Sequence, residues 1–176
     1  KMQQGAERFG AETLQTEVTE VDLAASPKSV TTADGMFFAN CVIIASGAEH
    51  KHLGIDGEEA LIGKGVGYCA ACDGMFYRGK TVVVVGGGNT AAGDALYLSR
   101  ICQKVYLIHR RDTLRATKLY QTQLENTPNV ELCYNATVKT LLGEDRISGV
   151  ELQDVNTKET ATLPLDGLFI SVGQNP

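Results

Sequence analysis

Hydrophobic residues in the second half of the chain gather in short runs that helix or turn signals separate. The runs Thr81–Val85 and Lys104–Ile108 have the length and β-branched composition of buried strands. Between them, small and apolar residues recur every three or four positions over 89–102, a spacing typical of a helix. The pattern therefore predicts a strand, a helix and a second parallel strand, the βαβ unit of a Rossmann-like sheet.

The rest of this half continues the alternation and then changes to shorter runs broken by turn residues. The further expected elements are a helix over 115–125, a strand over 130–134, antiparallel strands over 138–142, 147–154 and 160–163, and a buried strand over 167–172. The predicted fold class is α/β: a Rossmann-like parallel sheet with flanking helices and an antiparallel β-meander.

The first half has a different pattern. Residues 16–32 form short β-type runs between turn signals, which predicts a small meander. The uninterrupted apolar run Cys41–Ala45 predicts a central strand of a parallel sheet. Residues 50–67 are rich in glycine and charge without a long period, which is typical of a linker. We therefore expect two domains, over 1–50 and 51–176.

Composition excludes several classes of protein. With 43% hydrophobic and 21% charged residues, the 176-residue chain is typical of a globular protein. A net charge of -5 argues against a nucleic-acid partner, because such binding depends on an excess of Lys and Arg. No apolar run approaches the roughly 18 residues of a membrane span, so we expect no membrane partner. The polar N-terminus lacks the apolar core of a secretory signal, which favours a cytoplasmic protein.

A glycine-rich loop follows the first strand of the βαβ unit. Gly86-Gly87-Gly88-Asn89-Thr90-Ala91 matches G-x-G-x-x-G/A between a strand and a helix, the setting in which this pattern indicates dinucleotide binding. Gly86 permits the tight turn, Gly88 lets the backbone approach a pyrophosphate, and Ala91 lets the helix pack closely on the strand. The alternative is a glycine-rich turn without a ligand.

The basic residues that follow the next strand indicate whether the loop binds NAD or NADPH. In an NAD site, an acidic residue about 20 positions after the loop binds the ribose 2′-hydroxyl. Here the strand is followed by His109, Arg110 and Arg111, and Arg115 adds a further cation. Guanidinium groups bind a 2′-phosphate by charge-assisted hydrogen bonds, so we expect NADPH. Asp112 leaves two alternatives open, since it could neutralise a solvated basic turn or take the acidic role in an NAD site.

Two cysteines stand at the spacing of a reversible disulfide. Cys69 and Cys72 form a C-x-x-C pair, in which one thiol commonly has a depressed pKa and acts as a nucleophile. Zinc is the main alternative, but it needs two further ligands, and only His50 and His52 lie nearby in sequence. We therefore expect no metal. Asp73 is a candidate proton donor or acceptor for the thiols, although it could equally cap a helix.

The other three cysteines carry no expected chemistry. Cys41, Cys102 and Cys133 lie in apolar patterns, where a free cysteine is most often a small buried hydrophobic residue. A nicotinamide donates a hydride, whereas a disulfide accepts electrons through thiolate exchange, so a flavin is the expected intermediary.

These motifs, in this order and spacing, resemble the signatures of bacterial low-molecular-weight thioredoxin reductases. The similarity rests on Cys69-Ala70-Ala71-Cys72-Asp73-Gly74, on Gly86-Gly87-Gly88-Asn89-Thr90-Ala91 and on His109-Arg110-Arg111-Asp112, and it covers nearly the whole chain. The resemblance implies that NADPH reduces FAD, FAD reduces the Cys69–Cys72 disulfide, and the dithiol reduces thioredoxin or a thioredoxin-like protein.

Residue roles carry over with the resemblance. Cys72 would face the flavin, Cys69 would attack the thioredoxin disulfide, and Asp73 would be the acid/base partner. The NADPH site would be lined by Gly86, Gly88, Asn89, Thr90, Arg110, Arg111 and Arg115. The resemblance also implies domains that rotate relative to each other, and a homodimer when the chain is full length.

The chain departs from this family in lacking a first G-x-G-x-x-G for FAD, because Gly63-Lys64-Gly65-Val66-Gly67 follows no strand. The Gly-Asp motif for FAD is absent as well. We therefore expect a portion of a longer chain, with residues 1–50 as a partial FAD-binding domain. Two other functions remain open: a flavoprotein subunit of a peroxide-reducing system, and a noncatalytic NADPH-binding module whose cysteines bind zinc or sense redox state.

Overall fold

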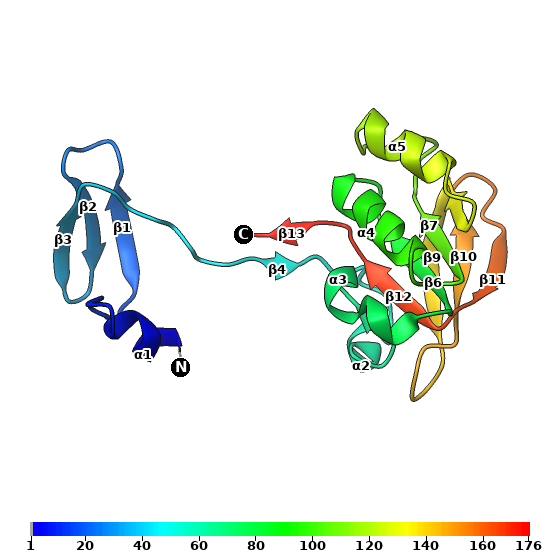
Figure 1. The fold of residues 1–176 in the computed structure, drawn as a ribbon, viewed down its shortest axis with the longest axis horizontal. Coiled ribbons are helices and arrows are strands. Elements are labelled where there is room, and N and C mark those ends of the chain that lie inside the picture. The colour runs from blue at the N-terminus through cyan, green and yellow to red at the C-terminus, as the bar shows by residue number, and fades with distance from the viewer. Residues whose placement is uncertain (1) are drawn as a thin grey trace. The chain divides into compact units, whose positions relative to one another are not determined.

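The protein is described by a computed structural model that covers residues 2–176 and divides into two compact units (Figure 1). The division falls between Gly47 and Ala48. The sequence pattern placed it three residues later, at 50/51.

The first unit is a short helix followed by a three-stranded antiparallel sheet. Helix α1 (Met2–Glu7) precedes strands β1 (Val18–Asp22), β2 (Lys28–Thr32) and β3 (Gly35–Ala39), which pair in that order. The strands carry β-branched and aromatic residues, and turn residues separate them. The meander expected from the sequence is therefore present, with a third strand that the pattern did not separate.

The apolar run after this sheet is not a strand. Cys41–Ala45 has no regular structure, and the side chains of Ile43 and Ile44 are 88% and 67% exposed. A strand needs neighbours for its N–H and C=O groups, and none of the described strands runs beside this segment. The expectation of a central strand is wrong for this chain, and so is the expected burial of Cys41, which is exposed.

The second unit is built on a five-stranded parallel sheet. Its strands are β5 (Val66–Gly67), β12 (Gly167–Ile170), β6 (Thr81–Val85), β7 (Lys104–Ile108) and β8 (Val130–Cys133), in that spatial order. Four of the five residues of β6 are buried, because both faces of the sheet are covered. The α/β fold class predicted from the sequence is confirmed.

Helices cover one face of this sheet (Figure 1). Helix α4 (Asn89–Ser99) places Ala91, Ala95 and Leu98 against β6 and β7, and α5 (Lys118–Glu125) packs beside it. Both helices are shorter than predicted. Helix α5 begins at Lys118, after Arg115 and Ala116, whose N–H groups donate to the carbonyl of Gly87.

An antiparallel meander covers the other face. Strands β9 (Ala136–Leu142), β10 (Gly149–Asp154) and β11 (Thr160–Pro164) pair in sequence, as predicted. Val83 and Val85 pack with this meander, whereas Val82 and Val84 pack with the helices, because alternate residues of a strand face opposite sides. The parallel sheet is thus held between two hydrophobic cores.

Residues 50–67 are more ordered than the expected linker. Strand β4 (Glu49–His50) pairs with β13 (Gln174–Asn175), and α2 (Glu58–Leu61) leads into β5. Leu61 is 3% exposed and belongs to the core beneath the meander. The sequence lacked a long period here because these elements are two to four residues long.

Two short elements follow β5. They are helix α3 (Ala70–Asp73) and a 3₁₀ turn over Gly74–Tyr77. Over residues 2–176, no helix is both long and apolar enough to cross a membrane.

Candidate active site

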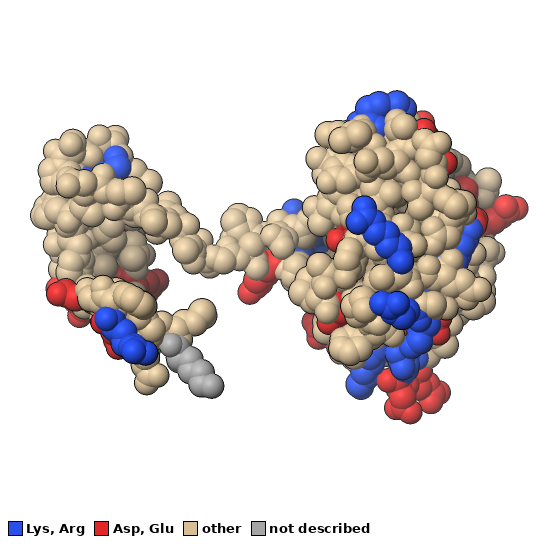
Figure 2. Space-filling view, viewed as in Figure 1, with Lys and Arg blue, Asp and Glu red and all other residues tan. Residues whose placement is uncertain are grey.

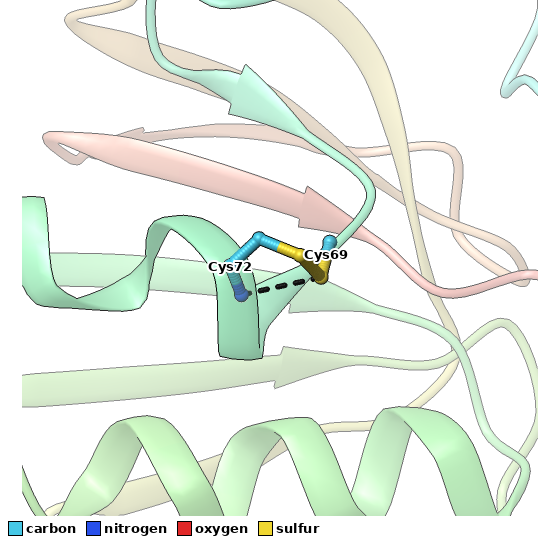
Figure 3. The surroundings of a disulfide bond; sticks show 2 residues. All are labelled: Cys69 and Cys72. Carbon is cyan, nitrogen blue, oxygen red and sulfur yellow. Dashed lines mark hydrogen bonds between the residues drawn. A yellow bond between two sulfur atoms is a disulfide. The ribbon is translucent and has the colours of Figure 1, made fainter. Parts of the chain in front are cut away.

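The two cysteines of the C-x-x-C pair form a disulfide at the start of α3 (Figure 3). Cys69 is the residue that precedes the helix, and its Cα lies 5.2 Å from that of Cys72. The backbone N–H of Cys72 donates to Sγ of Cys69 at 3.2 Å. Because an N–H donor stabilises negative charge on sulfur, this contact favours Cys69 as the thiolate once the disulfide is reduced.

The two sulfur-bearing residues differ in exposure. Cys72 is exposed on the surface of the second unit, whereas Cys69 is half-buried. Met75 and Phe76, just after the pair, are 51% and 74% exposed. Exposed apolar side chains beside a surface disulfide are suited to contact with another protein surface.

Asp73 directly follows the pair, and within residues 2–176 its side chain makes no hydrogen bond to either sulfur. Its backbone N–H donates to the carbonyl of Cys69 at 3.1 Å, and its half-buried carboxylate lies over Gly67 on β5. It makes no side-chain capping bond at the 3₁₀ turn that it precedes. The acid/base role of Asp73 stays a prediction.

The glycine-rich loop joins β6 to α4 at the carboxyl edge of the sheet. Gly86 has φ +154°, and a Cβ there would meet the carbonyl oxygen of Ser171 and the side chain of Ala91. A Cβ on Gly87 would fall on the ring of His109. Both glycines are therefore required by close packing, and the carboxyl edge where they lie is the usual ligand site of such sheets.

A pocket of about 520 Å³ opens beside this loop. Among the predicted site residues it is lined by Gly86, Gly87, His109, Arg110 and Arg115. Its lining includes no Asp or Glu, although the chain carries a net charge of -5. Figure 2 shows basic and acidic side chains interspersed on the face drawn. The lysine, arginine and histidine side chains of the pocket lining suit an anion such as phosphate.

His109 is the buried polar residue of this pocket. It is 7% exposed, and its Nε2 atom has no hydrogen-bond partner within residues 2–176. Burial lowers the pKa of His109, and the positive charges of Arg115, Arg111 and Arg110 lower it further. A neutral imidazole with an unused nitrogen, in a pocket lined by arginines, is a candidate hydrogen-bonding group for a ligand.

Five of the predicted cofactor residues lie outside the pocket lining. Arg111 is exposed, Asn89 accepts a hydrogen bond from the Thr117 N–H at 2.8 Å, and Ala91 is buried against the sheet. Gly88 and Thr90 are the other two. Asp112, the alternative ligand for an NAD ribose, also lies outside, and its carboxylate accepts from the Thr113 hydroxyl. The cofactor roles of these six, and of the five predicted residues in the lining, stay predictions.

The sequence analysis missed several residues of the lining, among them two with basic or imidazole side chains. Lys51 and His52 line the pocket from the segment after β4, which the sequence pattern had marked as a linker. Their contribution has no sequence signal, because the pairing of β4 with β13 joins positions more than 120 residues apart.

Replacing Gly88 with alanine tests ligand binding at the loop without disturbing the fold. A Cβ at this residue meets nothing within 4 Å, and its φ of -93° suits any residue. We expect Gly88→Ala to leave thermal stability unchanged but to weaken NADP⁺ binding about tenfold by calorimetry, because the methyl group occupies the path of the pyrophosphate.

Gly93→Ala is the matched control within the same helix. Its Cβ would lie 3.8 Å from the ring of Tyr120, an ordinary contact. It should raise stability by about 0.5–1 kcal/mol, as alanine does in helices, and keep NADP⁺ affinity. Equal binding by both variants would contradict a phosphate site at the loop.

The remaining thiols differ from the pair. Burial raises the pKa of both Cys102 and Cys133 to about 11, so these thiols stay protonated near neutral pH. Cys41 is exposed. Over the described residues, 2–176, no group of three His, Cys, Asp or Glu side chains is placed to hold a metal ion.

Comparison with known proteins extends these observations. A thioredoxin reductase of Streptomyces clavuligerus is 44% identical over 99% of this chain and 55% of that protein. The bifunctional thioredoxin reductase/thioredoxin of Mycobacterium leprae is 40% identical over 99% of this chain and 38% of that protein. The structure of the thioredoxin reductase from Giardia duodenalis superimposes with a TM-score of 0.87, at 34% identity, over 99% of this chain and 58% of that one.

The chain thus spans little more than half of the Streptomyces clavuligerus and Giardia duodenalis proteins and less of the bifunctional one, and the motif-based resemblance to thioredoxin reductases is confirmed. The family described as pyridine nucleotide-disulphide oxidoreductase matches residues 4–176. With its disulfide and its nucleotide-type loop in one unit, the chain belongs to the pyridine nucleotide-disulphide oxidoreductase family.

Proposed function

We propose that the chain is the NADPH-binding and redox-active portion of a thioredoxin-disulfide reductase. Electrons would pass from NADPH through FAD to the Cys69–Cys72 disulfide and then to thioredoxin. The observation that carries this proposal is the presence, in one compact unit, of a surface disulfide at the start of α3 and a cationic pocket at the glycine-rich loop.

NADPH fits the pocket by charge and by position. The free N–H groups at the start of α4 and the close-packed Gly86 suit a pyrophosphate. The guanidinium groups of Arg110 and Arg115 suit a 2′-phosphate, and the unpartnered Nε2 of His109 supplies a further polar contact. Arg111 would approach the ligand from outside the lining.

The flavin belongs to the proposal for the whole protein. A flavin accepts a hydride and passes electrons on to a disulfide. Residues 2–176 contain one strand–loop–helix with the glycine pattern, at 86–91, and no second one for FAD. The chain's own part in the reaction is therefore to bind the nicotinamide cofactor and to carry the dithiol, and residues 1–50 would complete an FAD-binding domain with segments outside this sequence.

The dithiol chemistry follows from the geometry of the pair. Reduction of the disulfide takes two electrons and two protons. The Cys69 thiolate then attacks a sulfur of the thioredoxin disulfide, forming a mixed disulfide and releasing one thioredoxin thiolate. Cys72 next attacks the Cys69 sulfur, which restores the disulfide and releases the second thioredoxin thiolate. Asp73 would accept and return the protons.

The partner and the setting are part of the same proposal. Met75 and Phe76 give thioredoxin an apolar surface beside the disulfide, and a relative that joins both names in one protein makes thioredoxin the natural candidate. We also propose a cytoplasmic location and a homodimer for the whole protein.

The test is single-turnover reduction of thioredoxin by the whole protein under NADPH or NADH, followed by thiol titration. We expect NADPH to support reduction and NADH to support it at least about tenfold less well, since one phosphate contact contributes a kcal/mol or more. Reduction of a peroxiredoxin-type partner in place of thioredoxin would favour a peroxide-reducing system. Binding of NADPH without reduction of any disulfide partner would reduce the proposal to a binding module.

A further inference from the structure

The segment that follows β4 forms part of the pocket beside the glycine-rich loop, the nucleotide pocket. Lys51 and His52 share its lining with Gly86 and Gly87. The backbone N–H of Lys51 donates to the carbonyl of Gly173 at 3.0 Å, which fastens the segment to the chain after β12. These two residues are therefore held at the pocket by backbone contacts rather than lying on a free loop.

The ring of His52 is held by a polar cluster on its other side. The hydroxyl of Tyr68 donates to the Glu58 carboxylate at 2.6 Å, and Nδ1 of His52 lies 2.7 Å from the same hydroxyl oxygen. A hydroxyl carries one hydrogen, so Nδ1 must be the donor to the Tyr68 oxygen. Nε2 is then the free nitrogen of a ring that is 51% exposed.

Glu58 makes this cluster rigid. It is 3% exposed, and it accepts hydrogen bonds from the backbone N–H groups of Leu53 and Gly54 as well as from Tyr68. Burial alone would raise its pKa, but these hydrogen bonds and the nearby His52 outweigh burial and lower it. Glu58 is thus a buried carboxylate, 3.3 Å from Nδ1, that can pair with a protonated His52.

The same cluster reaches the redox-active loop. Tyr68 directly precedes Cys69, and its ring stacks on His50 with centroids 5.0 Å apart and meets His52 edge-on at 5.4 Å. Neither Tyr68 nor Glu58 lines the nucleotide pocket. His52 is the residue that joins the pocket to this cluster.

We propose that His52, held by Tyr68 and Glu58, donates from Nε2 to the pyrophosphate of the bound dinucleotide and so links the nucleotide pocket to the loop that carries Cys69. The proposal rests on the proposed function, because it needs a dinucleotide in this pocket. His52 is a binding residue, whereas Tyr68 and Glu58 are positioning residues.

Pyrophosphate is the phosphate that this position favours. His52 shares the lining with Gly86 and Gly87, the loop residues against which a pyrophosphate packs. Because Nδ1 donates to Tyr68, Nε2 can donate to phosphate only when the imidazole is protonated. His52 has acidic and basic neighbours. It lines a second, smaller hollow together with Asp56, Glu58 and Glu59, beside Tyr68, and it lines the nucleotide pocket together with Lys51, Arg110 and Arg115. His50 and His109 are the other imidazoles nearby.

The experiment is calorimetric binding of NADP⁺ and of 2′-AMP, which lacks a pyrophosphate, to the whole protein. We expect His52→Gln to weaken NADP⁺ binding about three- to tenfold, as befits one charged hydrogen bond at a half-exposed residue, and to leave 2′-AMP binding unchanged.

Tyr68→Phe tests the link itself. It removes the oxygen that His52 donates to, so NADP⁺ affinity should fall about two- to threefold, but not further when His52 is already glutamine. Tyr106→Phe, a half-buried tyrosine of β7 outside the cluster and the pocket, is the control and should bind as the wild type does.

The possible results distinguish a failure of the role of His52 from a failure of the proposed function. Unchanged NADP⁺ affinity in His52→Gln, an equal loss of 2′-AMP binding, or additive effects in the double variant would overturn the role of His52 and leave the proposed function standing. A wild-type protein that binds no NADP⁺ would overturn the proposed function, and this inference with it.

Discussion

Serine at Cys69 or at Cys72 is expected to lower the single-turnover rate of thioredoxin reduction at least about a thousandfold, since each removes a sulfur that the exchange cannot bypass. The other two cysteines of the second unit are poor substitutes for the missing thiol. Cys102 and Cys133 have a pKa raised to about 11 by burial, so neither supplies a thiolate near neutral pH. The rate is measured by thiol titration of thioredoxin after one equivalent of NADPH.

The two variants should also differ from each other. With serine at 72, the Cys69 thiolate can still attack thioredoxin but nothing resolves the mixed disulfide, so intact mass should show a one-to-one adduct. With serine at 69 the adduct should be far less abundant, because the Cys72 N–H contact stabilises charge on Sγ of Cys69. Cys41→Ser, which removes an exposed thiol elsewhere, is the control and should react as the wild type does. Reduction that survives either serine at 69 or 72 would show that the pair is structural.

The parts of the fold that the sequence predicted are those that local chemistry determines. The strand, glycine loop and helix around Gly86 follow from the apolar run, the small residues and the three- to four-residue spacing within 25 positions. The parallel sheet and the meander followed from the same kind of pattern. The end of α4 was misjudged by three residues, since Cys102 is buried beyond the helix and continues its apolar spacing.

The parts that the sequence missed depend on contacts between distant positions. The run Cys41–Ala45 has the composition of a strand, yet strand formation needs a neighbouring strand that these residues do not have. Helix α3 is four residues long, too short to show a period. The hydrogen bond from Tyr68 to Glu58 and the place of His52 in the pocket arise only when β4 and β5 join the second unit.

The basic residues after β7 could be identified from the sequence, but their positions relative to the pocket could not. The sequence indicated Arg110, Arg111 and Arg115 equally, because a string of residues carries no direction. In the structure all three are exposed, but Arg110 and Arg115 line the pocket, whereas Arg111 lies outside the lining and its carbonyl accepts from the Asn135 N–H at 3.1 Å. The structure therefore ranks three cations that the sequence could not rank.

This ranking predicts which arginines distinguish NADPH from NADH. Arg110→Leu and Arg115→Leu are each expected to weaken NADPH binding about tenfold, and about a hundredfold together, since a hydrogen bond to a charged group contributes roughly 1.5–3 kcal/mol before solvent screening. NADH binding should change little, because NADH lacks the 2′-phosphate. Dissociation constants for both cofactors, from calorimetry on the whole protein, give the selectivity ratio directly.

Arg111→Leu removes the same charge from the neighbouring residue and is the matched control. If the pocket lining decides recognition, this variant keeps NADPH affinity within about threefold, the size of a screened surface interaction. A loss at Arg111 as large as at Arg110 would mean that the turn after β7 moves its second arginine onto the phosphate when the ligand binds. Equal losses of NADPH and NADH in the Arg110 and Arg115 variants would instead place these guanidinium groups on the pyrophosphate and leave the preference for NADPH without a structural basis.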